Sequence, residues 1–283
     1  MDAGVRRVCA LARLGTAVVV AVVSLGSAAT PALAQGGGAN SGAITWSANV
    51  DVPSVYVFRG MVQERDPAAT VQPSGDLQIA FGKMMATLST WHSLQSGSSG
   101  SKGPTGRLHY EERLAAGFSV PTGAGTTLTT TYTAYTAPGN LFETRHEVGL
   151  RLASRQMLKP YGLVAVELKG AADGIADGHG SYLELGVGPA LPLSFMRGTL
   201  TVPARVGVSL KNYYQGFDGD HRFGFFDVGG LLTVPLNRSG GAYGRWNLHG
   251  GVDVYLLGDT PKVVFNNGSK TKIVGLVGLG LRY

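Results

Sequence analysis

The sequence predicts an all-β protein: a transmembrane antiparallel up-and-down β-barrel of about 12 strands, whose C-terminal strand ends in an aromatic residue. Three observations predict this class. Apolar and polar residues alternate with a period of two along most of the chain. The polar positions carry charges of both signs and not only Ser and Thr. Many alternating segments exceed the ~9–11 residues that a tilted strand needs to cross a bilayer, whereas globular strands centre on ~5–6.

The composition excludes several other classes. Of the 283 residues, 44% are hydrophobic and only 15% charged, which is too apolar for a disordered chain, and a single Cys excludes a disulfide-built module. Beyond the N-terminus, no uninterrupted apolar stretch approaches the ~20 residues of a membrane-spanning helix. The net charge of +6 comes without a run of basic residues, so nucleic acid is not expected as a partner.

The N-terminal segment has the layout of a secretory signal peptide. Arginines precede an apolar run from Leu14 to Leu25, and small residues follow up to Ala34. Cleavage is expected between Ala34 and Gln35, and the mature chain would then contain no Cys, because Cys9 lies within the leader. The predicted divisions are a signal peptide (1–34), a short N-terminal periplasmic segment (35–43) and an outer-membrane β-barrel (44–283).

The alternating segments follow one another without a helical period between them. In the clearest case, Leu108, Tyr110 and Leu114 alternate with charged residues such as Glu111 and Arg113. The predicted strands lie near residues 44–59, 70–81, 84–93, 107–118, 126–136, 141–153, 157–169, 181–190, 199–212, 222–236, 243–257 and 272–283.

The connections also alternate in character. Those after odd-numbered strands are mostly long or polar, and those after even-numbered strands are tight, as in outer-membrane barrels. The short connection 137–140 is an exception. A soluble sandwich or lipocalin-like barrel would bury the apolar face instead, but aromatic residues near strand ends favour the two interfacial girdles of a membrane barrel. These aromatic residues are Trp46, Phe58, Tyr110, Phe118, Phe142 and Trp246.

Two motifs resemble known sequences. Val277, Leu279, Leu281 and the terminal Tyr283 look like the β-signal of bacterial outer-membrane proteins, which implies recognition by the barrel-assembly machinery. The run 55–60, Val-Tyr-Val-Phe-Arg-Gly, followed by Gln63, resembles the opening motif of the TorF-type porin family, although Val55 stands where that family has an Asp. The resemblance implies a bacterial outer-membrane barrel with porin function.

Charged side chains on the polar face are candidates for lining a pore, and rings of such charges would set its selectivity. The alternative is that opposite charges pair across neighbouring strands and fill a narrow interior. Arg59 could line a constriction, bind a ligand or form an ion pair with the loop that contains Gln63. The candidates are Arg59, Arg107, Arg113, Arg145, Glu147, Arg151, Lys159, Arg205, Lys211 and Arg245; strict alternation also places Lys169 in the lumen.

The function expected from these features is passive diffusion of small solutes or ions through a narrow, mixed-charge lumen in the outer membrane. A closed structural or adhesive barrel that presents surface loops is the alternative, and a lipid-modifying enzyme is a weaker one. His92 and Ser93 are adjacent in a strand and so point to opposite faces, and Asp218, Asp220 and His221 are expected to form a solvated loop. No catalytic, cofactor or metal residues are predicted, and the expected partners are lipid, the assembly machinery and small solutes.

Overall fold

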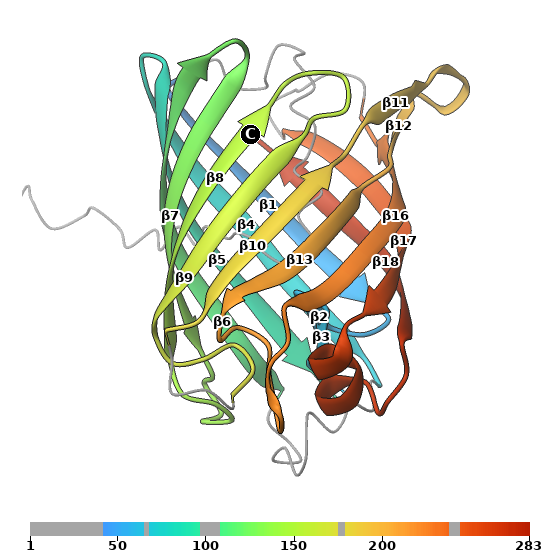
Figure 1. Cartoon of the computed structure of the whole chain (residues 1–283). Coiled ribbons are helices and arrows are strands. Elements are labelled where there is room, and N and C mark those ends of the chain that lie inside the picture. The colour runs from blue at the N-terminus through green and yellow to red at the C-terminus, as the bar shows by residue number, and fades with distance from the viewer. Residues whose placement is uncertain (1–41, 65–67, 97–107, 175–178, 238–243) are drawn as a thin grey trace, which may run out of the picture.

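The computed structural model describes residues 42–64, 68–96, 108–174, 179–237 and 244–283, and it confirms the predicted class. Antiparallel strands form one closed barrel (Figure 1). The signal peptide and Arg107 lie outside the described residues. The wall is built from β1 (Ile44–Pro53), β4 (Thr70–Phe81), β5 (Met84–Gln95), β6 (His109–Gly123), β7 (Thr126–Thr136), β8 (Arg145–Ser154), β9 (Tyr161–Lys169), β10 (Ser181–Val187), β11 (Ala190–Leu193), β12 (Gly198–Thr201), β13 (Ala204–Lys211), β16 (Phe223–Pro235), β17 (Arg245–Leu257) and β18 (Thr271–Arg282).

The ring contains 12 strands because two of them are interrupted. β11 continues β10, and β12 and β13 both pair with β16, so each of these two pairs acts as one long strand. The ring closes where β16 pairs with β17 and where β1 pairs with β18. At that seam Trp46 and Tyr283 exchange two backbone hydrogen bonds of 2.9 Å.

The two ends of the barrel differ. The turn end carries Tyr283 and tight turns such as Gly82-Lys83, and the loop end carries longer connections such as 137–144 and 212–222. The connection 212–222 contains a small hairpin of β14 (Gln215–Gly216) and β15 (Gly219–Asp220). The connection 137–144 fits the alternation of short and long connections, because β8 begins at Arg145 and not at residue 141 as the sequence predicts.

Helical structure is sparse. Within the described ranges it is limited to η1 (Ser194–Met196) and η2 (Pro261–Phe265). None of the helices in the described part of the chain is long and apolar enough to cross a membrane.

The outward face of the wall is apolar and the inward face polar. Large side chains such as Leu88, Leu150 and Val277 are about half exposed, while charged residues of the alternate positions, such as Glu147 and Asp227, are buried inside. This inside-out distribution is that of a membrane barrel.

The predicted girdles of aromatic residues are only partly correct. Trp46, Phe118 and Trp246 are exposed on the outside. Phe58 and Tyr110 are instead buried in the interior, and Phe142 packs against them. Half of the predicted girdle residues therefore belong to the core of the lumen.

Tyr110 turns inward because of a β-bulge. Ser93 pairs with Glu111 and Leu94 with His109, so Tyr110 is the extra residue in β6. A bulge breaks the alternation of side-chain directions. Tyr110 therefore points into the barrel, next to lumen-facing Glu111 on the same strand.

Candidate functional site

The first predicted strand ends too late, and its last part folds into the barrel. The prediction extends to residue 59, whereas β1 ends at Pro53. Ser54 still donates to the Gly275 carbonyl of β18 at 2.8 Å. Residues 55–64, here called the inner hairpin, leave the wall and form β2 (Val57–Phe58) and β3 (Met61–Val62). The predicted strand 44–59 therefore has the correct secondary structure at residues 57–58 but the wrong location.

A tight turn makes the inner hairpin possible. The two-residue loop Arg59-Gly60 joins β2 and β3, with φ of 48° and 78°, as a type I′ hairpin turn requires. Gly60 is needed for a second reason, because a Cβ there would lie 2.8 Å from Cβ of Phe225. Gly60 thus allows both the positive φ of the turn and the close approach of the opposite wall.

The inner hairpin fills the loop half of the lumen. Val55, Tyr56, Phe58 and Met61 are at most 3% exposed. Each of the 12 wall strands contributes at least one buried residue to this interior: Pro53, Ser74, Trp91, Arg113, Tyr135, Glu147, Glu167, Tyr182, Ser209, Phe225, Tyr255 and Val274.

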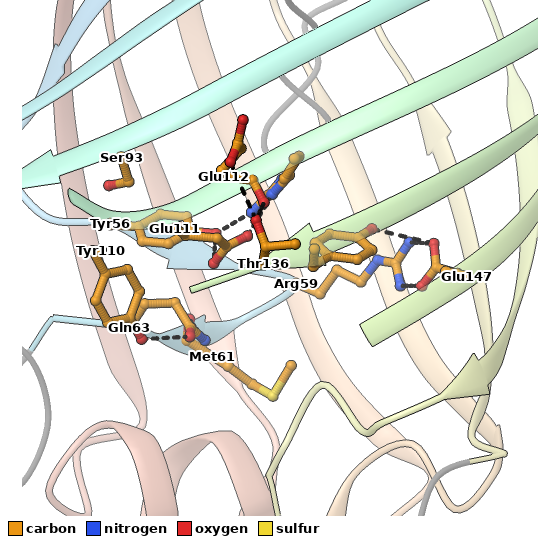
Figure 2. Close-up of polar contacts among 12 residues, drawn as sticks. Tyr56, Arg59, Met61, Gln63, Ser93, Tyr110, Glu111, Glu112, Thr136 and Glu147 are labelled. Atoms are coloured by element: carbon orange, nitrogen blue, oxygen red, sulfur yellow. Dashed lines mark hydrogen bonds and ion pairs between the residues drawn. The ribbon is translucent and has the colours of Figure 1, made fainter. Parts of the chain in front are cut away.

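Arg59, at the tip of the inner hairpin, is held by Glu147 of the wall and by two tyrosines of the connection 212–222. Its Nη1 and Nη2 donate to the two carboxylate oxygens of Glu147 at 2.6 and 2.8 Å (Figure 2). Nη1 also donates to the Tyr213 hydroxyl at 2.5 Å, and the Tyr214 hydroxyl donates to the Arg59 carbonyl at 3.0 Å. A bidentate Arg–carboxylate pair fixes direction as well as charge, so the tip has one defined position.

A second network of hydrogen bonds holds Tyr56, in the first half of the inner hairpin. The Tyr56 hydroxyl donates to Glu111 at 3.0 Å and accepts from Arg113, whose Nε donates to Glu111 at 2.6 Å. Burial raises the pKa of the Tyr56 hydroxyl well above its ordinary value, so it stays neutral. The predicted lumen residue Arg113 is thus a structural partner of the hairpin.

Phe58 lies among three arginines. The guanidinium carbons of Arg113, Arg59 and Arg145 are 4.5, 5.0 and 5.5 Å from the centre of its ring. Such cation–π contacts gain strength when water is excluded. The interior therefore stabilises concentrated positive charge with aromatic faces as well as with carboxylates.

Glu64, where the inner hairpin leads back toward β4, is buried with one oxygen unsatisfied. Its Oε2 accepts from the Thr70 hydroxyl, while Oε1 has no protein partner. Two further buried polar atoms, Nε2 of Gln72 and Oγ of Ser74, are also unpartnered on β4. Burial raises the pKa of Glu64 from its ordinary value, although its contact with Thr70 opposes the shift.

The turn half of the lumen contains a cavity of ≈ 60 Å³. Lys159, Tyr161, Arg205 and Asp253 are among the residues that line it. Arg205 forms an ion pair with Asp227 and donates to the Tyr255 hydroxyl at 3.0 Å. Charges of both signs therefore border this space.

The structure separates the predicted pore residues into groups. Arg59, Arg113, Arg145 and Glu147 meet around the inner hairpin. Arg205 and Lys159 border the cavity, and the guanidinium carbon of Arg151 lies 4.3 Å from the centre of the Tyr161 ring. Arg245 is half-buried in β17, next to outward-facing Trp246.

Lys211 and Lys169 do not belong to the lumen. Both are exposed, and both lie beside β-bulges that turn them outward. The lumen prediction is therefore wrong for these two lysines, because one extra residue in a strand reverses the direction of the next side chain.

The residues considered for catalysis and metal binding have structural partners. A ring nitrogen of His92 lies 3.1 Å from one of His109 and another lies 2.8 Å from the Thr90 hydroxyl, while Ser93 is buried and accepts from Gln95. Asp220 accepts hydrogen bonds from Ser209 and from backbone amides of its loop. Among the described residues, no three His, Cys, Asp or Glu side chains gather as a metal site requires.

Sequence patterns do not predict Tyr213 and Tyr214 as site residues, nor the inward course of residues 55–64. A signal for the hairpin is present, since Arg59-Gly60 separates the apolar pairs Val57-Phe58 and Met61-Val62. Nothing comparable marks the two tyrosines, which lie in a connection between strands.

No family model and no curated protein matches the sequence. The NanC porin is similar in structure, with a TM-score of 0.48 and 7% identity, covering 83% of this chain and 98% of that one. The KdgM porin has a TM-score of 0.45 and 7% identity, with coverage of 84% and 98%. The translocator domain of autotransporter NalP from Neisseria meningitidis has a TM-score of 0.46 and 14% identity, with coverage of 86% and 90%.

Proposed function

We propose that the protein is an outer-membrane, porin-like channel through which small solutes or ions diffuse passively, and that the inner hairpin controls how often it is open. The loop end would face the exterior and the turn end the periplasm, as in barrels with short periplasmic turns. The leader 1–34 would direct export, and Val277 to Tyr283 would be recognised by the assembly machinery.

The observation that carries the proposal is the lumen itself. A ring of 12 strands lies between eight strands, whose side chains fill the interior, and 16, which leave an aqueous channel. The turn half has a cavity bordered by Lys159, Arg205 and Asp253, and the loop half is filled by a segment that is not part of the wall. Displacing residues 55–64 would leave the pairing of β1 with β18 and with β4 intact, since both ladders lie within residues 44–53 of β1.

Planar-bilayer recording tests the proposal. The wild-type protein is expected to give small or infrequent conductance steps, and Arg59→Ala is expected to give larger or more frequent ones, because the tip of the inner hairpin loses its anchor. Arg155→Ala, which changes an exposed arginine in a tight turn, is the matched control and should behave like the wild type.

A closed structural barrel is the second candidate, and the packing of the loop half favours it. Every wall strand contributes a buried residue to the interior. This alternative predicts no conductance steps at any voltage, either in the wild type or in variants that remove the Arg59–Glu147 pair. That outcome would overturn the channel proposal.

A further inference from the structure

Two lysines face outward although strict alternation places them in the lumen. In β9, Glu167 is buried inside, but the next two residues, Leu168 and Lys169, are both exposed. Glu147 pairs with Glu167 and His146 with Lys169, so β9 contains one extra residue. Residues paired directly across antiparallel strands share a face, and Lys169 therefore lies outside, beside His146.

A β-bulge also turns a lysine outward in β13. Ser209 is buried inside, and Leu210 and Lys211 are both exposed. Tyr182 pairs with Ser209 and Ser181 with Lys211, so this strand also carries an extra residue. Both bulges lie at the loop end, and each changes the direction of a lysine side chain, as bulges commonly do.

Each lysine follows a leucine that continues the lipid-facing band. Leu168 and Leu210 are 50% and 51% exposed on the apolar outer face. β9 and β13 flank β10, so the two lysines belong to one sector of the wall. A lysine in this position extends its apolar stem along the barrel and its ammonium toward the membrane surface.

His146 adds an oriented donor to this sector. Its Nδ1 lies 2.6 Å from the Tyr132 hydroxyl, and the two rings stack with their centres 5.8 Å apart. In the tautomer in which Nδ1 accepts from Tyr132, Nε2 carries the proton and can donate outward. The described part of the chain shows no ion pair for Lys169 or Lys211.

We propose that His146, Lys169 and Lys211, here called the lysine sector, bind the phosphate of a phosphorylated lipid in the leaflet at the loop end. Two ammonium groups and a ring N–H complement a phosphate. The adjoining leucines point to a lipid and not to free phosphate, because they offer the acyl chains an apolar surface. The proposal needs the barrel to lie in a membrane but does not need it to conduct.

Native mass spectrometry of the full chain in neutral detergent tests this, with phosphatidic acid as the probe and diacylglycerol as its uncharged counterpart. The wild type is expected to retain phosphatidic acid in preference to diacylglycerol. Each lysine near a membrane surface should contribute about fivefold in affinity, so Lys169→Gln with Lys211→Gln should weaken retention about 25-fold. Lys83→Gln, in an exposed turn at the other end, should leave it unchanged.

Three results would overturn the proposal: equal retention by the double lysine variant, equal loss in Lys83→Gln, or full competition by inorganic phosphate at the same concentration as the lipid. The last would assign the sector to free phosphate. Because no current is measured, failure here is distinguishable from failure of the channel proposal.

Discussion

Arg59 and Glu147, separated by 88 positions in the sequence, are joined by two hydrogen bonds across the barrel interior. Their side chains are only 10% and 9% exposed. Removing one partner of such a buried pair leaves an uncompensated charge, at a cost of about 3–5 kcal/mol. The pair is therefore a strong anchor for the tip of the inner hairpin, beside the contacts with Tyr213 and Tyr214.

Arg59→Ala should destabilise the protein more than the double variant Arg59→Ala with Glu147→Ala, because the double variant leaves no unpaired carboxylate. Thermal unfolding in detergent measures this order. If the double variant were as unstable as Arg59→Ala, or less stable, the predicted order and the direct coupling of these side chains would be contradicted.

Gly60→Ala should loosen the inner hairpin through both backbone strain and a clash with Phe225. Gly82→Ala is the matched control, since Gly82 also has positive φ, 61°, but a Cβ added there would meet no atom within 4 Å. Limited proteolysis should cut Gly60→Ala faster than Gly82→Ala. Equal rates would show that the close contact with Phe225 has no effect.

The inner hairpin should be held less tightly as pH rises. Burial raises the folded-state pKa of Glu64, so the folded state binds the proton more strongly than the unfolded state. The stability that this proton contributes is complete below the ordinary carboxyl pKa of ~4.3 and is lost as pH rises through the folded pKa. In a series of unfolding measurements against pH, Glu64→Gln should flatten this part of the profile, and exposed Glu143→Gln should not.

Leu150→Arg should destabilise the barrel in vesicles by about 2–4 kcal/mol if Leu150 faces the middle of the bilayer. Leu150 is 47% exposed on the outer face. Ser154→Arg, at the end of the same strand, should cost at most about 1 kcal/mol. Denaturant titration of the reconstituted protein measures both, and equal effects would contradict the predicted membrane position.

The wall can be predicted from the sequence because a lipid-facing strand repeats its apolar residue at every second position, as β8 does with Val148, Leu150 and Leu152. The path of the inner hairpin cannot be predicted in this way. Val55 to Phe58 are four consecutive apolar residues that follow the alternating residues of β1. Such a run is consistent with a strand buried on both faces, but it does not show that the strand folds into the barrel. Alternation also misplaces Lys169 and Lys211, because one extra residue reverses the direction of the side chains that follow.

The contacts of the inner hairpin also limit when the interior of the barrel can pack during folding. Although it directly follows the first strand, it packs on Phe225, Tyr213 and Tyr214, more than 150 positions later. Contacts between such distant parts of a chain form slowly. The packing of the inner hairpin can therefore be completed only after β16, the tenth strand of the ring, has formed. Assembly intermediates that lack it would be emptier inside than the finished barrel.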